Sequence, residues 1–158
     1  MWNDMTYEQI LIKITAICAR SEHCLFDIKQ KMDRWKVNED TQQLVLKYLI
    51  DEKFIDEERY AKYFINDKIK YNKWGKKKIE QALWLKRIPR NVYQEYLDSI
   101  EDNDYEEILL PLLKTKMKCV KGKDEYEIKM KTTRYALQRG FSYEQIQHCL
   151  ELLANEEI

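Results

Sequence analysis

A run of cations with few acids contains the residue types that could bind an anion. Between Lys62 and Arg90 there are ten basic residues and only two acidic ones, although the whole chain balances 28 basic residues against 28 acidic ones. Charge concentrated in this way usually faces a phosphate-bearing or acidic partner. Aromatic residues interleave with the cations, as on surfaces that bind single-stranded nucleic acid. The residues predicted to form this contact surface are Lys70, Lys73, Trp74, Lys76, Lys77, Lys78, Lys86, Arg87 and Arg90.

Three of these lysines break a local rule of helix stability. Lys76, Lys77 and Lys78 fall in the first turn of a helix predicted to start after Gly75. A positive charge there opposes the helix dipole and costs about 0.3–1 kcal/mol. Phosphates or an acidic protein surface would compensate, and exposed first-turn amides would help to bind an anion. The alternative is a solvated face that keeps a neutral protein soluble.

Other residues with chemical potential fit ordinary structural roles. Asp56, Glu57 and Glu58 are expected to cap a helix and to favour its dipole rather than to bind a metal. An aromatic set at helical spacing could form a recognition stripe, but we favour a buried helix face for Tyr60, Tyr63, Phe64 and Tyr71. Two groups of cysteine and histidine lack the spacing of a tetrahedral metal site: Cys18, His23 and Cys24, and His148 and Cys149.

The sequence holds no motif that indicates catalysis. There is no glycine-rich phosphate loop and no nucleophile elbow, so we predict that the chain is not an enzyme and needs no cofactor or metal. Four cysteines without paired spacing, and no secretion signal, favour reduced thiols in a cytoplasmic protein. The longest apolar run, residues 108–113, is too short to span a bilayer. We expect a monomer without membrane attachment.

The elements that must position these residues are predicted to be all α-helical. With only 3 glycines and 2 prolines in 158 residues, the composition argues against turn-rich β folds. Nine helices are expected, and Pro111 should kink the seventh or delay its start. Their predicted starts are Thr6, Ser21, Asn38, Asp56, Gly75, Pro89, Asp104, Glu125 and Ser142, with cap pairs at Thr6–Gln9, Asp104–Glu107 and Ser142–Gln145.

The helices are predicted to form three repeats of three. Val37, Ile88 and Phe141 occupy the same hinge between the second and third helix of each repeat, with matching apolar positions upstream in the first two. The predicted repeats are residues 1–54, 55–101 and 102–158, with net charges of −1, +3 and −2. Three such units joined end to end predict an elongated, gently curved molecule whose basic middle unit makes the main contacts.

Local motifs resemble those of the RecX family of RecA regulators. Phe54-Ile55-Asp56-Glu57 followed by Arg59-Tyr60-Ala61 is similar to the family's acidic turn, arginine, aromatic and alanine. Trp74-Gly75-Lys76, with Ile79 and Leu83 downstream, resembles its glycine–basic–helix segment. The resemblance covers essentially the whole chain and is sharpest from Phe54 to Ile88. The family often has glycine before the hinge hydrophobe, whereas Lys36 and Arg87 stand there in the first two units, which argues against a left-handed helix end.

The resemblance implies a regulator rather than a catalyst. It implies tandem three-helix repeats that bind RecA filaments on single-stranded DNA and modulate, usually inhibit, RecA's ATP hydrolysis, strand exchange and co-protease action. It therefore points to homologous recombination, DNA repair and the SOS response. Two alternatives stay open. One is a stand-alone helical DNA-binding protein of the helix-turn-helix type, which would bind duplex DNA without RecA. The other is a helical scaffold for some other protein.

Overall fold

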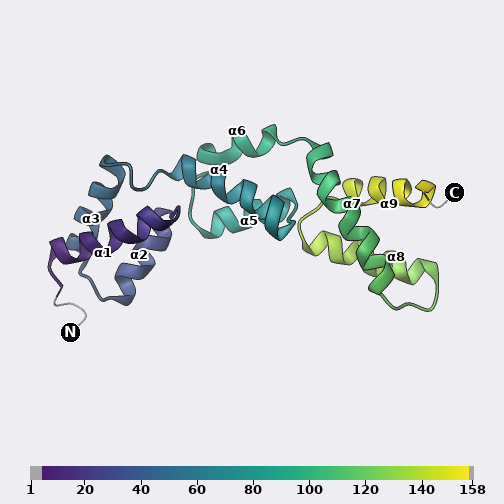
Figure 1. Ribbon diagram of the computed structural model, residues 1–158, viewed down its shortest axis with the longest axis horizontal. Coiled ribbons are helices and arrows are strands. Elements are labelled where there is room, and N and C mark those ends of the chain that lie inside the picture. The colour runs from purple at the N-terminus through teal and green to yellow at the C-terminus, as the bar shows by residue number, and fades with distance from the viewer. Residues whose placement is uncertain (1–4, 157–158) are drawn as a thin grey trace.

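The chain folds into a row of helices that runs from one end of the molecule to the other (Figure 1). The structure is a computed structural model that describes residues 5–156. No strand occurs among these residues, so the all-α prediction is confirmed. The helices are α1 (Tyr7–Arg20), α2 (Leu25–Arg34), α3 (Glu39–Asp51), α4 (Glu57–Asp67), the π-helical turn η2 (Lys68–Asn72), α5 (Lys76–Leu85), α6 (Arg90–Ser99), α7 (Asp102–Cys119), α8 (Glu125–Gln138) and α9 (Tyr143–Glu156).

Side-chain caps start several of these helices where the sequence predicts. Thr6, Asn38 and Asp56 each accept a hydrogen bond from the backbone N–H three residues later. Ser142 and Gln145 cap α9 reciprocally, at 3.0 and 3.1 Å. These bonds satisfy amides that have no partner inside the helix. Four of the predicted starts are thus confirmed at the level of the cap.

Two predicted starts are wrong. Ser21 does not begin α2 but ends α1, and α2 begins after Cys24. Cys24 is fully buried against the middle unit, so the segment before it stays extended to reach that contact. Glu101, paired with Asp104, begins α7 three residues early, so Pro111 lies inside the helix and does not delay its start.

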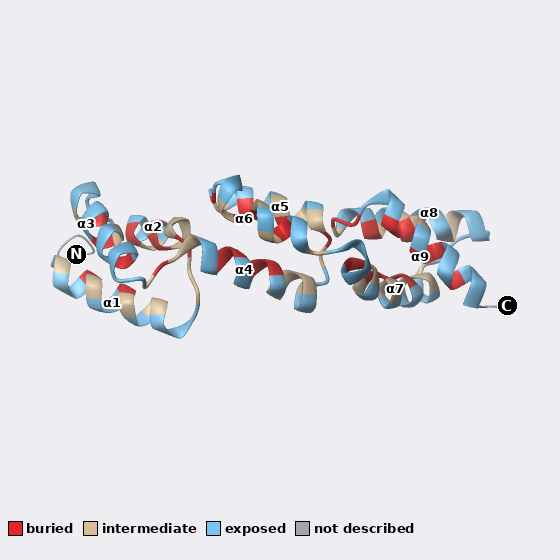
Figure 2. Ribbon diagram, turned by 90° about the horizontal axis from the view of Figure 1, so that it is seen from above, coloured by how far each residue is buried: buried red, intermediate tan, exposed pale blue. Residues whose placement is uncertain are grey.

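Each group of three helices encloses its own apolar cluster, and Figure 2 shows buried stretches along the helices of each group. The first cluster centres on Ile14, Ile28 and Leu49, and the second on Ile65, Ile79 and Leu97. The third centres on Leu109 and Ile146 and on further residues of α7, α8 and α9. Separate cores in series give an elongated array rather than a single globule, which confirms the predicted fold class.

The same hinge recurs between the second and third helix of each group. Lys36, Arg87 and Gly140 have φ of 56°, 59° and 97°. The next residue donates its N–H five residues back in every case, from Val37 to Met32, Ile88 to Leu83 and Phe141 to Ala136, at 3.0–3.3 Å. This is the Schellman helix end.

The expectation that Lys36 and Arg87 argue against a left-handed helix end is therefore wrong. A left-handed residue with a side chain costs about 1–2 kcal/mol. Turning the chain there buries Val37 and Ile88, which are 8% and 4% exposed. Burial of such a side chain contributes about 1.5–3 kcal/mol, so the packing outweighs the backbone strain.

Candidate contact surface

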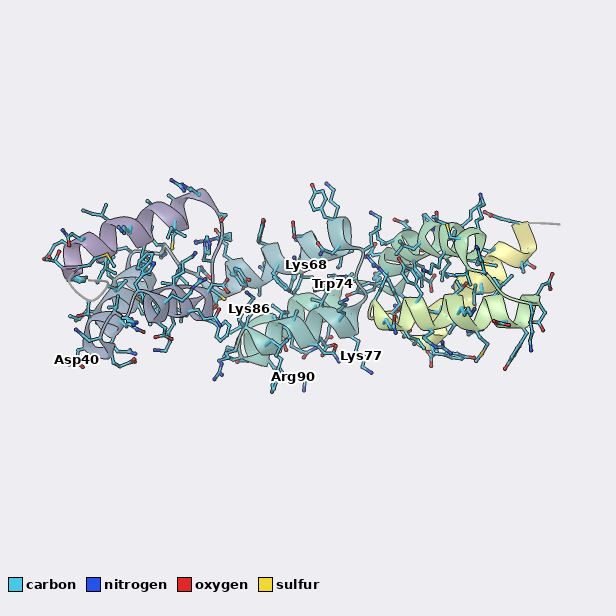
Figure 3. The ribbon with its side chains drawn as sticks, turned by 90° about the horizontal axis from the view of Figure 1, so that it is seen from below. Asp40, Lys68, Trp74, Lys77, Lys86 and Arg90 are labelled. Atoms are coloured by element: carbon cyan, nitrogen blue, oxygen red, sulfur yellow. The ribbon has the colours of Figure 1, made fainter. Side chains whose placement is uncertain are left out.

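The predicted contact residues lie on η2 and α5 and at the start of α6. Ile79 and Leu83 are fully buried and fix one face of α5 against the core of the middle unit. Lys77 therefore lies on the outer face, and Figure 3 shows it and Arg90 pointing away from the ribbon. Before α5 the chain passes through the π turn η2, which ends at Lys73 with φ of 56°. Such π turns are frequent at functional sites.

The structure separates the predicted set into two groups at opposite ends of α5. A ten-residue helix is about 15 Å long. Lys70, Lys73, Trp74, Lys76, Lys77 and Lys78 belong to the end near the third unit, and Lys86, Arg87 and Arg90 to the end near the first unit. The sequence does not predict this division.

The group near the first unit is largely engaged within the protein. Lys86 Nζ lies 2.6 Å from Asp27 Oδ1 on α2, and the two side chains are only 33% and 19% exposed. The Arg87 guanidinium lies 5.6 Å from the centre of the Phe26 ring. Arg90 donates to Gln94 Oε1 at 3.0 Å. Lys86 and Arg87 thus join the middle unit to the first unit, where cation–π contacts and a shielded ion pair stabilise the junction.

Two residues of the other group also have internal partners. Lys76 Nζ lies 2.7 Å from Asp98 Oδ1, and this hydrogen bond, with one from Gln94, lowers the pKa of the Asp98 carboxyl. Lys78 Nζ lies 4.7 Å from the centre of the Trp74 ring. Trp74 is half-buried against the core, and Figure 3 shows it between the helices.

Lys70, Lys73 and Lys77 remain for contact with a partner. All three are exposed, and none forms an ion pair within residues 5–156. Lys70 Nζ lies 5.1 Å from the centre of the Tyr71 ring, which is 67% exposed. These residues form what we call the η2 surface: Lys70, Tyr71, Lys73 and Lys77.

The first turn of α5 is covered by the end of α8. Gly75 N–H donates to the carbonyl of Arg139 at 2.8 Å, and Lys77 N–H donates to the carbonyl of Gly140 at 3.1 Å. The prediction that these amides are exposed to an anion is wrong for both. The carbonyl end of one helix faces the amide end of another, so the negative pole of α8 compensates the lysines on α5.

The aromatic set divides between core and surface. Tyr60 and Phe64 are buried at 5% and 8% exposed, as predicted, but Tyr63 is 50% exposed and Tyr71 lies on the η2 surface. The prediction of a wholly buried face is wrong: Tyr63 lies at the edge of the buried face of α4, and the π turn changes the helical phase before Tyr71. The outer face of α4 and η2 is therefore aromatic as well as basic.

Buried titratable groups lie at the junction of the first two units. Burial raises the pKa of the Cys24 thiol to about 12 and raises the pKa of the Glu57 carboxyl. Glu57 Oε2 has no hydrogen-bond partner in the described residues. Within residues 5–156 no group of three potential metal ligands occurs. No helix in that range has both the length and the apolarity to cross a membrane.

Two kinds of residue at the site could not be recognised from the sequence pattern that was used. The acidic partners Asp27 and Asp98 lie 59 and 22 positions from their lysines, and no local pattern signals such pairs. The same pattern also passed over the third unit, whose net charge is negative. Five lysines without an acid occupy residues 114–123, and that local count would have revealed a second basic surface.

Comparison with known proteins places these helices in a family. Residues 56–97 match the model of the second three-helix domain of RecX, and residues 103–150 match that of the third, so that together they cover more than half of the chain. The third-unit match lies where the motif resemblance is less sharp. The regulatory protein RecX of Finegoldia magna is 37% identical over 92 residues, which are 57% of this chain and 45% of that protein. The regulatory protein RecX of Clostridium botulinum (strain Eklund 17B) is 28% identical over 133 residues, 83% of this chain and 62% of that protein.

A solved structure shows the same fold. A crystal structure of regulatory protein RecX superposes with a TM-score of 0.84 at 18% identity, covering 92% of this chain and 73% of that one. At this identity the likeness concerns the fold. The chain spans about half to three fifths of the length of the two curated relatives. The two domain matches, on consecutive three-helix groups of the array, show that the chain belongs to the RecX family.

Proposed function

We propose that the chain is a non-enzymatic regulator that binds RecA filaments on single-stranded DNA and lowers RecA's ATP hydrolysis, strand exchange and co-protease activity. Membership of the RecX family supports a regulatory role. The observation that carries the proposed contact is the η2 surface, where Lys70, Lys73 and Lys77 are exposed without acidic partners in the described residues and Lys70 lies 5.1 Å from the exposed Tyr71 ring. The proposal implies a cytoplasmic monomer.

The proposal also assigns roles to the three units. Residues 1–54, 55–101 and 102–158 act as successive repeats, and the middle one makes the main contact. Within the predicted set, Lys70, Lys73 and Lys77 contact the partner directly. Two of the other predicted residues, Lys86 and Arg87, join the middle unit to the first unit. The rest shape the surface through contacts within the middle unit: Lys76, Lys78, Arg90 and Trp74. An elongated array suits a filament, because it can follow a groove along several subunits.

Titration into a RecA ATPase assay on single-stranded DNA tests the function. We expect hydrolysis to fall at a small fraction of the RecA concentration. A fall only when the DNA is saturated would instead favour a stand-alone DNA-binding protein that competes for the strand. No effect on the cognate RecA at any concentration would refute the proposal.

A triple charge reversal tests the surface. Lys70→Glu, Lys73→Glu and Lys77→Glu together should raise the concentration for half-inhibition at least about tenfold, because like charges would replace three attractive ones. The matched control is Lys31→Glu, Arg34→Glu and Lys36→Glu in the first unit. It makes the same charge change and includes a left-handed residue equivalent to Lys73. Equal inhibition by wild type and the η2 triple would reject the site while leaving the function in place.

A further inference from the structure

The third unit carries a second basic surface that the middle-unit prediction does not include. A shallow, open cleft of about 390 Å³ lies between the C-terminal end of α7, the loop that follows and α8. Four of its lining residues are cations, Lys116, Lys121, Lys131 and Arg134, and none of the described lining residues is acidic. The surrounding unit has a net negative charge, so the cleft is a local concentration of positive charge.

Most of the positive charge in the cleft is not neutralised by the protein. Lys131 is the exception, with Glu127 Oε1 at 3.1 Å from its Nζ, and it also donates to the Lys121 carbonyl at 2.7 Å. Lys116, Lys121 and Arg134 take part in no ion pair within residues 5–156. Three uncompensated cations around a hollow favour the binding of an anion.

Aromatic contacts hold part of this charge in place. Lys116 Nζ lies 4.5 Å from the centre of the Tyr135 ring, and the Arg139 guanidinium lies 5.4 Å from it. A cation already restrained by a ring loses less side-chain entropy when a ligand binds. Tyr135 therefore prepares the cleft for a ligand and connects it to Arg139.

Arg139, which contacts the cleft residue Tyr135, reaches across the junction between the second and third units. Its Nε donates to the Lys73 carbonyl at 3.2 Å, and its Nη2 donates to the Asn72 carbonyl. Lys73 belongs to the η2 surface, next to Lys70 and the exposed ring of Tyr71. Cations thus follow one another from the α7–α8 cleft to η2, along contacts that the structure records.

We propose that the α7–α8 cleft binds the phosphodiester backbone of a single nucleic-acid strand, which continues over Arg139 to Lys73 and Lys70. A linear series of cations fits a linear polyanion, and lysines bind phosphates as point charges. The exposed Tyr71 offers a face on which an unpaired base can stack, which favours a single strand over a duplex or an acidic peptide. The proposal rests on the proposed function only in taking the strand to be DNA, and it requires no RecA.

Binding of a fluorescent oligothymidine, measured by anisotropy without RecA, tests this proposal. Lys116→Glu, Lys121→Glu and Arg134→Glu together should weaken binding at least about tenfold. They should also reduce the slope of log K against log salt by about 2, because each lost phosphate contact contributes about 0.7. The control is Lys114→Glu, Lys118→Glu and Lys129→Glu, which makes the same charge change at a different cavity of the same unit. It should change affinity less than about threefold.

Three outcomes would overturn the proposal. Unchanged affinity of the cleft triple would show that no strand lies there. Equal losses in both triples would show a general effect of charge rather than a site. The third outcome involves polyglutamate as a second ligand. If oligothymidine binds wild type and the cleft triple equally, but polyglutamate binds only wild type, the cleft is a site for an acidic protein. The variant with glutamine at all three cleft positions answers the same questions if charge reversal unfolds the unit. Because RecA is absent, none of these results repeats a failure in the ATPase assay.

Discussion

Gly75→Ala should separate the second unit from the third. The φ of Gly75 is −85°, which alanine adopts without strain, so the backbone itself does not require glycine. A Cβ there would lie 2.4 Å from the backbone carbon and oxygen of Gly140 and from the nitrogen of Phe141. None of these atoms belongs to a flexible side chain. The α5 start and the α8 end must therefore move apart by about 1 Å to reach ordinary contact.

The size of the effect follows from what that movement breaks. The Gly75–Arg139 and Lys77–Gly140 backbone hydrogen bonds, at 2.8 and 3.1 Å, would both be lost. Each contributes about 1 kcal/mol, and more where the freed group stays buried. Gly→Ala at an unhindered position would instead stabilise by about 0.4–1 kcal/mol. We therefore expect a net loss of about 2–3 kcal/mol in the free energy of unfolding, or about 4–12 °C in Tm for a chain of this size.

Thermal unfolding followed by circular dichroism, with small-angle X-ray scattering of the folded protein, measures the two consequences. Gln81→Ala, on the exposed face of α5, controls for changes in helix propensity. We expect Gly75→Ala to lower Tm and alter the scattering profile while helicity at low temperature stays the same. A Tm at or above that of wild type would refute the reasoning, because it would show that the Gly75–Gly140 contact does not hold the units together.

Two further predictions concern buried groups near the first junction. Burial raises the pKa of the Glu57 carboxyl in the folded protein above its value in the unfolded chain, so folding favours the protonated form. The contribution of Glu57 to the free energy of unfolding is therefore lost as pH rises through the folded-state pKa. Glu57→Gln should raise the urea midpoint near neutral pH and match wild type in acid; a lower neutral midpoint would show that the carboxylate itself is needed. Cys119 is exposed, whereas Cys24 is fully buried with its pKa raised to about 12, so a maleimide at mildly alkaline pH should modify Cys119 first, and equal rates by peptide mapping would contradict the structure.

Local patterns predicted most of the helix starts and the grouping of the helices, but not the starts of α2 and α7 or the π turn η2. Capping residues such as Asn38 and Asp56 act within four residues of chain, and apolar spacing defines a helix face without knowledge of its partner. The hinge at Lys36 could be located from its repeat spacing, but its left-handed conformation depends on how much burial Val37 gains. Local propensity alone gave the wrong answer there, because the packing that decides it is tertiary.

The candidate site was harder to predict because charge was counted along the chain and not in space. Lys86 and Lys70 contribute equally to the local charge of the middle unit, yet Lys86 is held by Asp27 of the first unit and Lys70 is exposed. Conversely, the cleft cations of the third unit were hidden by acids elsewhere in it. A charge count measures attraction over about a Debye length, whereas a contact site depends on which cations lack a partner within hydrogen-bond reach.

The two junctions of the array use different chemistry, which bears on how its units can move relative to one another. The first relies on side chains: Cys24 is buried in the second cluster, Lys86 pairs with Asp27, and Arg59 pairs with Glu22 at 2.8 Å, where both side chains are partly exposed. The second relies on backbone hydrogen bonds at Gly75, and on Ile69, which touches both the second and the third cluster. Salt screens exposed ion pairs but not buried backbone bonds or apolar contact. The second and third units, which carry both proposed binding surfaces, are therefore the more firmly joined pair, and the first unit is the one best able to adjust its angle.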